Sequence, residues 1–132
     1  MSVNQVTKND TQTLLKVETV SDHYKKPLFC KVDTGAEGNV ISLSTYKSLF
    51  PNASYNPGGI PTSLTPSSTI ITAFGGHTVG HYGTYVLKLD YGGSCKPSPF
   101  HIVDADGPTI LGLPTSKDLN LVTMNFSITN EP

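Results

Sequence analysis

The 132-residue chain contains no arginine: its nine positive charges are all lysines, and ten acidic residues bring the formal net charge to −1. A nucleic-acid-binding domain normally carries a basic stripe and uses arginine for bidentate contacts to bases and phosphates. Charged residues make up only 14% of the chain, against roughly 25% in an average soluble domain. The composition therefore argues against nucleic acid as a partner.

Long apolar segments and cysteine are also scarce. No run approaches the ~18 apolar residues that suggest a membrane span, and residues 1–13 lack the apolar stretch of a signal peptide. The two cysteines, Cys30 and Cys95, cannot build a disulfide framework and form no Cys-x-x-Cys pair. We therefore expect no membrane partner and a reducing compartment.

Frequent glycine and proline (12 and 10 residues) exclude long helices. The length suits one core, so we predict a flexible polar segment at residues 1–13 and one domain at residues 14–132. Alternating apolar positions and turn residues predict short strands. They are Leu14–Val20, Leu28–Val32, Val40–Ile41, Ser68–Phe74, His77–Asp90, Phe100–Val103, Thr109–Leu111 and Leu121–Ile128. Gly80 and Gly83 within the longest of them indicate bulges or close backbone approach.

Two short helices complete the predicted elements. Ser42–Phe50 has helical spacing of its apolar residues, with Ser42 as N-cap and Pro51 as the stop. Thr115–Leu121 opens with a Thr-x-x-Asp capping pattern made by Thr115 and Asp118. The predicted class is all-β, a small closed barrel or sandwich with one or two short helices.

The motif with the clearest chemical potential is Asp33-Thr34-Gly35-Ala36, which directly follows a predicted strand. It places a carboxylate at a tight turn, where glycine lets a ligand approach the backbone closely and alanine leaves room for a substrate. Asp and Gly are also common turn residues, so the tripeptide by itself leaves a purely structural turn open. About 75 residues downstream comes an apolar strand that ends in glycine, Thr109-Ile110-Leu111-Gly112, and between the two lies the glycine-centred reversal Phe74-Gly75-Gly76-His77.

This order of motifs resembles the retropepsins, the aspartic proteases of retroviruses and LTR retrotransposons. Phe100–Val122 is most similar to the gypsy-type retrotransposon branch, and the resemblance covers Leu14–Ile128. It implies catalytic roles for Asp33, Thr34 and Gly35. It also implies substrate contacts for Ala36, Glu37, Val40, Phe74, Gly75, Gly76, His77, Pro108 and Ile110, with Phe74–His77 as the tip of a flap that closes over the substrate.

The resemblance further implies a homodimer. Peptide hydrolysis of this type needs two carboxylates that share a proton, and the chain has a single Asp-Thr-Gly, so the second aspartate must come from a second copy. Retroviral relatives usually carry arginine after the glycine of the second motif, whereas this chain reads Gly112-Leu113-Pro114. We therefore expect the last strand, Leu121–Ile128, to hold the dimer largely through strand pairing.

Other candidate sites are weaker. His77 and His81 would be roughly 13 Å apart along a strand, too far to share one zinc ion. Asp104 and Asp106 lack the ligand series of a calcium loop and are predicted to be solvated turn residues, and Cys30 is predicted to be a small core residue. We expect no metal and no cofactor.

The resulting hypothesis is an aspartic endopeptidase that cleaves a Gag-Pol-type polyprotein, in the cytoplasm and within virus-like particles. Two alternatives stay open: a domesticated host protease of the same fold, and a retropepsin-fold binding or dimerisation module without catalysis. The intact Asp33-Thr34-Gly35-Ala36 argues against the latter, because only catalysis requires the carboxylate.

Overall fold

A computed structural model describes residues 14–22, 24–72 and 76–121. These residues form short strands and two short helices. The strands are β1 (Leu15–Val20), β2 (Lys25–Val32), β3 (Asn39–Ser42), β4 (Ile71–Thr72), β5 (Thr78–Tyr91), β6 (Ser94–Asp104) and β7 (Thr109–Leu111), and the helices are α2 (Leu43–Leu49) and α3 (Leu113–Asp118). No helix within the described ranges is long and apolar enough to cross a membrane.

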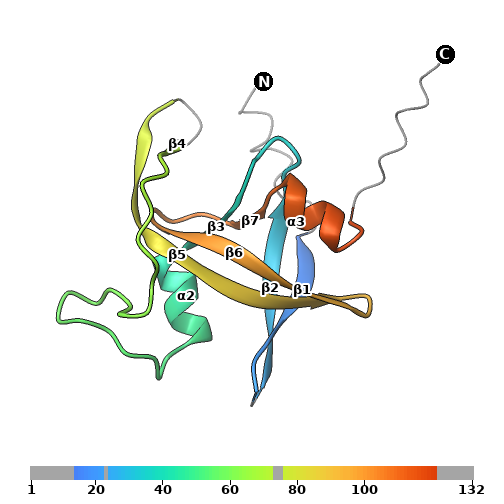
Figure 1. Cartoon of the computed structure of the whole chain (residues 1–132), viewed down its shortest axis with the longest axis horizontal. Coiled ribbons are helices and arrows are strands. Elements are labelled where there is room, and N and C mark those ends of the chain that lie inside the picture. The colour runs from blue at the N-terminus through green and yellow to red at the C-terminus, as the bar shows by residue number, and fades with distance from the viewer. Residues whose placement is uncertain (1–13, 23, 73–75, 122–132) are drawn as a thin grey trace.

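The strands close into a barrel. Their order is β1-β2-β7-β3-β6-β5-β4, and β1 also pairs with β5 through Glu18 and Asp90. This extra pairing joins the two ends of a six-strand sheet and leaves β4 outside it, as an arm on β5. Figure 1 shows the helices on different sides of the barrel, with the β4–β5 arm projecting from it. The prediction of an all-β closed barrel or sandwich with one or two short helices is confirmed, and the structure has the barrel form with both helices.

The core follows the two-residue period of the strands. Every second residue points inward, and the inward positions are apolar in most strands; examples are Leu28 and Cys30 in β2 and Phe100 and Ile102 in β6. Helix α2 adds Tyr46, whose ring lies 5.4 Å from that of Tyr85 on the barrel. The core role predicted for Cys30 is confirmed, and burial raises the pKa of its thiol to about 12.

Two strands begin earlier than predicted, and the added residues include prolines. Strand β2 starts at Lys25 rather than Leu28, with Pro27 paired opposite Glu18. Strand β6 starts at Ser94 rather than Phe100, and its Pro97 and Pro99 are exposed. Strand β3 pairs with β6 only from Phe100 onward, so among the described residues the earlier part of β6 pairs with β5 alone. On its other side a missing backbone N–H costs no ladder hydrogen bond.

Within the described part of the strand predicted at Ser68–Phe74, only β4 is formed. The register between β5 and β6 shifts between His81 and Gly83, which is a β-bulge. At Gly83 the backbone has φ +140°, and an added Cβ would lie 2.7 Å from the carbonyl oxygen of Thr65. The predicted bulge or close approach at Gly83 is therefore confirmed, and regular pairing resumes only at Ile71.

Helix α2 begins as predicted, with the Ser42 side chain accepting a hydrogen bond from the Thr45 N–H. Helix α3 does not. It begins at Leu113 with Gly112 as N-cap and Pro114 in its first turn, so the predicted Thr115–Asp118 cap is wrong. Proline fits the first helical turn, where its missing N–H has no partner to lose. The helix also ends earlier than predicted, at Asp118, and Asn120 follows with φ 59°. The predicted last strand lies outside the described residues from position 122 onward.

Candidate active site

The two motifs singled out in the sequence meet at one edge of the barrel. Strands β2 and β7 are parallel and in register from Cys30 with Thr109 to Val32 with Leu111. Parallel strands end at the same edge of a sheet, and the Asp33 N–H continues the pairing by donating to the Leu111 carbonyl at 2.9 Å. The loop that follows each strand therefore starts beside the other.

The loop after β2 holds the carboxylate of Asp33 in place. One carboxylate oxygen, Oδ1, accepts a hydrogen bond from the Gly35 N–H at 3.0 Å, and the Ala36 N–H donates to the Asp33 carbonyl at 3.0 Å. An aspartate that bonds the backbone two residues ahead makes an Asx turn. Asp33 is half-buried, and no ion pair within 4.0 Å engages it among the described residues. Asp33 thus forms the turn and also presents a partly exposed carboxylate.

Gly112 lets the second loop pack directly on the first. A Cβ at this position would lie 2.6 Å from the Gly38 carbonyl oxygen and 2.8 Å from that of Ala36. The next residue, Leu113, donates its N–H to the Ala36 carbonyl at 2.9 Å. Only a residue without a side chain allows this approach, so Gly112 is required to keep the Asp33 loop at its position.

A buried asparagine on β3 hydrogen-bonds to backbone and side-chain groups around Gly112. Asn39 is 2% exposed, and its Oδ1 accepts from the Gly112 N–H at 2.8 Å. Its Nδ2 donates to the Thr115 hydroxyl at 2.7 Å and to the Pro99 carbonyl at 2.9 Å. This side chain therefore links β3, β6 and the start of α3.

The barrel face that carries Asp33 also carries a row of half-buried side chains. Cross-strand partners share a face of a sheet, and the pairings run from β2 through β7, β3 and β6 to β5. We call these residues the half-buried row; they are Lys31, Ile110, Val40, His101 and Thr84. Asp33 follows Lys31 by two positions and continues the extended backbone of β2, so it points to the same side.

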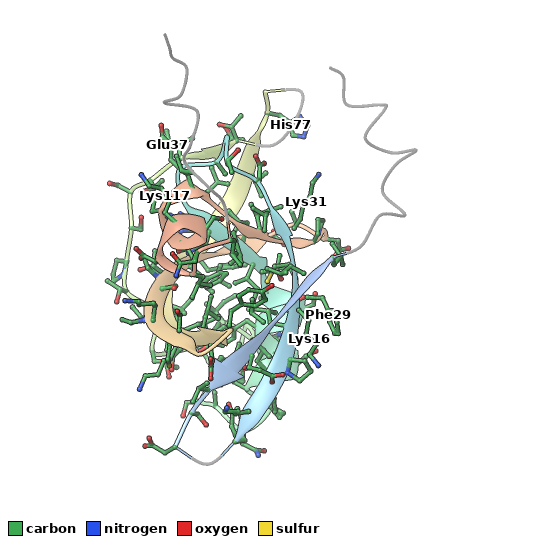
Figure 2. All side chains as sticks on the ribbon, turned by 90° about the vertical axis from the view of Figure 1, so that its right-hand side faces the viewer. Lys16, Phe29, Lys31, Glu37, His77 and Lys117 are labelled. Carbon is green, nitrogen blue, oxygen red and sulfur yellow. The ribbon has the colours of Figure 1, made fainter. Side chains whose placement is uncertain are left out.

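The remaining predicted site residues take different positions. Val40 and Ile110 are direct cross-strand partners, as expected for residues that line a common pocket. The side chains of Thr34, Glu37 and Pro108 are exposed around the Asp33 loop and β7. Gly76 and His77 are exposed between β4 and β5, and Figure 2 shows His77 and Glu37 at the same end of the molecule. Phe74 and Gly75 lie outside the described residues.

His81 contacts another histidine, not His77. Its Nε2 lies 3.2 Å from Nδ1 of His101, and the two rings are 4.9 Å apart. His81 also reaches the carbonyl oxygens of Thr69, at 3.2 Å, and Gly83, at 3.1 Å. Burial, followed by the charge of His81, lowers the pKa of His101 below the ordinary histidine value. This pair connects the base of the β4–β5 arm to the half-buried row.

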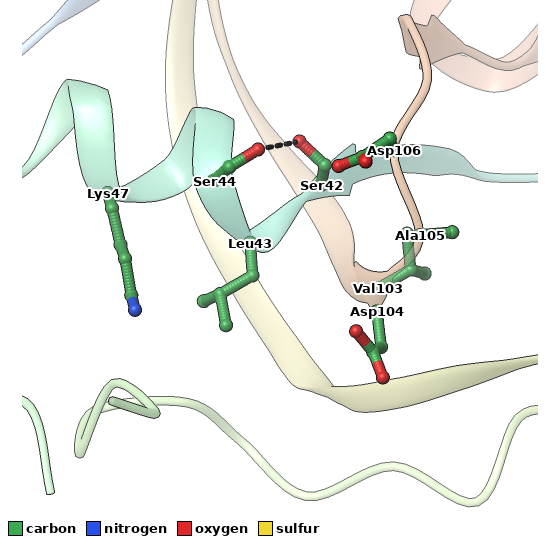
Figure 3. A pocket seen from close by; sticks show the side chains of 8 residues that line it. All are labelled: Ser42, Leu43, Ser44, Lys47, Val103, Asp104, Ala105 and Asp106. Carbon is green, nitrogen blue, oxygen red and sulfur yellow. Dashed lines mark hydrogen bonds between the residues drawn. The ribbon is translucent and has the colours of Figure 1, made fainter. Parts of the chain in front are cut away.

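A cavity of about 230 Å³ lies elsewhere, between the start of α2 and the end of β6 (Figure 3). It is lined by Ser42, Leu43, Ser44, Lys47, Val103, Asp104, Ala105 and Asp106. Its serine hydroxyls bond one another or cap α2, and both aspartates are exposed as predicted. Asp106 lies in the connection after β6, whereas Asp104 is the last residue of that strand and pairs with Gly80, so its predicted position in a turn is wrong. Because Asp33 is not part of its lining, we do not assign the catalytic chemistry to this cavity.

Sequence reasoning missed three residues of the site. Lys31 could have been recognised from the sequence, since a lysine is unusual inside an apolar strand that leads to a carboxylate. Asn39 and His101 gave no local signal, because each acquires its role through partners distant in the sequence; Asn39 and Thr115 are 76 positions apart.

The sequence matches no protein-family model and no curated protein. Comparison with solved structures finds the EIAV protease complexed with the inhibitor HBY-793, at a TM-score of 0.59 and 20% identity, covering 83% of this chain and 89% of that one. It also finds the retroviral protease-like domain of Ddi1 from Leishmania major, at a TM-score of 0.52 and 18% identity, covering 80% and 77%. The chain therefore has a retropepsin-type fold.

Proposed function

We propose that this chain is an aspartic endopeptidase whose active unit is a homodimer, with one Asp33 from each copy. The observation that carries the proposal is the Asp33 carboxylate itself. It is half-buried, oriented by the Gly35 N–H, and held by a loop that packs on the backbone at Gly112. A carboxylate braced in this way, without an ion-pair partner among the described residues, is suited to proton transfer.

In the proposed mechanism the two carboxyl groups share one proton, because like charges a few ångströms apart cannot both ionise cheaply. The ionised group takes a proton from a water molecule while the water oxygen attacks the peptide carbonyl. The protonated group gives its proton to the carbonyl oxygen. The group that took the proton from water then gives it to the amide nitrogen, while the other group takes back a proton from a hydroxyl of the tetrahedral intermediate. The C–N bond breaks, a carboxylic acid and an amine leave, and the shared proton is restored.

The homodimer follows from the single Asp-Thr-Gly in the sequence. Thr34 is exposed beside Asp33, where a second copy of the loop could reach it. The β4–β5 arm, with Gly76 and His77, would cover the substrate, and Ala36, Glu37, Val40, Pro108 and Ile110 would contact it. We propose a Gag-Pol-type polyprotein of a gypsy-type retrotransposon as the substrate, processed in cytoplasmic virus-like particles, on the strength of the resemblance over Phe100–Val122.

The proposal is tested by incubating the pure protein with a Gag-derived polyprotein, with and without an aspartic-protease inhibitor. Wild type should cleave, and Asp33→Asn should be folded and inactive, because an amide cannot hold or pass the shared proton. Asp106→Asn is the matched control, since Asp106 is an exposed turn residue. Cleavage by Asp33→Asn at the wild-type rate would refute the mechanism.

The dimer has its own test. Adding an excess of Asp33→Asn to a fixed amount of wild type should suppress cleavage, because exchange of subunits places most wild-type chains in inactive mixed dimers. An equal excess of bovine serum albumin serves as a control for added protein. Cleavage that stays constant over the whole titration, with subunit exchange demonstrated by sedimentation of a size-tagged copy, would mean that one chain suffices.

A further inference from the structure

Lys31 is the one cation of the half-buried row. It follows the core residue Cys30 in β2 but faces the opposite side, because successive residues of a strand alternate. Its cross-strand partner is Ile110. In Figure 2 Lys31 extends toward the end of the molecule at which His77 and Glu37 also lie, whereas Lys16 is lower, on the β1–β2 hairpin.

The charge of Lys31 is not neutralised within the described part of the chain. The two ion pairs found there, Lys16 with Glu18 and Lys25 with Asp90, use other lysines. Lys31 is half-buried beside an isoleucine, and an ammonium group in such surroundings gains more from an anionic partner than one in open water does. The site therefore offers a cation next to an apolar surface.

The position of Lys31 relative to Asp33 determines which part of a bound peptide its ammonium group can contact. The two residues are two positions apart on extended backbone and share a face, which separates them by roughly 6.6 Å along the strand. This distance is about the spacing between side chains on one side of an extended peptide. A peptide that lies in line with β2, with its scissile bond over Asp33, would thus place a flanking side chain over Lys31 and Ile110.

We infer that the enzyme selects an acidic side chain, glutamate in particular, at a position flanking the scissile bond. The inference rests on the proposed function. The methylene groups of the glutamate would pack against Ile110, and its carboxylate would meet the Lys31 ammonium. In a two-fold dimer each copy supplies one such lysine.

The test uses two sets of peptides that differ only in the flanking residue, with Glu, Gln, Leu or Lys on either side of one cleavable bond. The value of kcat/KM is measured at about pH 5.5, where a free glutamate side chain is ionised. We expect wild type to prefer Glu over the isosteric Gln by about tenfold, and this ratio to shrink at high salt. Lys31→Met should bring the ratio close to one, and Lys31→Glu should make Lys the preferred residue.

Lys88→Met is the matched control, because Lys88 is an exposed residue of β5 that pairs with Pro97, away from Asp33. It should keep the wild-type ratio. Cleavage by wild type without a preference for Glu, or a preference that survives in Lys31→Met, would overturn this inference and leave the protease assignment intact. Failure of the folded wild type to cleave any peptide, including the Gag-derived polyprotein, would overturn both.

Discussion

Replacing Gly112 by alanine tests the packing that holds the candidate catalytic loop. The new Cβ would lie 2.6 Å from the Gly38 carbonyl oxygen and 2.8 Å from that of Ala36, and both are backbone atoms that cannot rotate away. Overpacking of this kind costs about 1–3 kcal/mol. The required shift also weakens two hydrogen bonds of about 1 kcal/mol each, from Gly112 to Asn39 and from Leu113 to Ala36.

The expected loss in the free energy of unfolding is therefore about 3 kcal/mol, which lowers Tm by roughly 10 °C for a domain of this size. Under the proposed function, kcat should also fall on the order of 100-fold, because displacing Asp33 by about 1 Å misaligns the reacting groups. Thermal unfolding followed by circular dichroism measures the first effect, and cleavage of a fluorogenic peptide measures the second.

Gly38→Ala is the matched control, because it adds the same methyl group to the other side of the same contact. Its Cβ would lie 3.5 Å from the His101 ring, an ordinary van der Waals distance. We expect this variant to lose less than about 1 kcal/mol. The reasoning is refuted if Gly112→Ala melts within a few degrees of wild type, or if the two variants are destabilised equally.

Three further predictions concern groups around the site. Asn39→Leu should lower the free energy of unfolding in urea by about 3 kcal/mol, since it removes three hydrogen bonds and leaves the buried Gly112 N–H and Thr115 hydroxyl without this partner; a loss below about 1 kcal/mol would contradict the role assigned to this amide. A thiol reagent should modify exposed Cys95 in the native protein and Cys30 only after unfolding, because burial raises the Cys30 pKa to about 12; equal native rates for both would show that Cys30 is accessible. Burial and His81 lower the pKa of His101 in the folded state, so the unfolded chain binds this proton more tightly, and stability should be complete above about pH 6.5 and decline as the pH falls below it. His101→Gln should make that decline shallower in urea titrations at successive pH values, and identical slopes would exclude a contribution from His101.

Several features of the protein are determined locally by its sequence. The two-residue period of apolar positions specified most strands and the burial of Cys30, because alternation alone decides which side chains point inward. The Ser42 cap of α2 is equally local, since the hydroxyl and the Thr45 N–H are three positions apart. The Asp33 turn is local too, because the carboxylate bonds the N–H of Gly35.

Only the tertiary structure decided the rest, because the partners involved are distant in the chain. Asn39 bonds Thr115 across 76 positions, and α3 begins after Gly112, with Pro114 in its first turn, rather than at the capping pattern. The prolines of β6 are tolerated because β3 does not pair with β6 at their positions. A short stretch of sequence cannot show this, because β3 and β6 are far apart in the chain. The sequence shows Lys31 as an unusual lysine in an apolar strand, but only the parallel pairing of β2 with β7 places it beside Ile110, on the face of Asp33. Local chemistry selected the catalytic candidate, and long-range pairing decided what surrounds it.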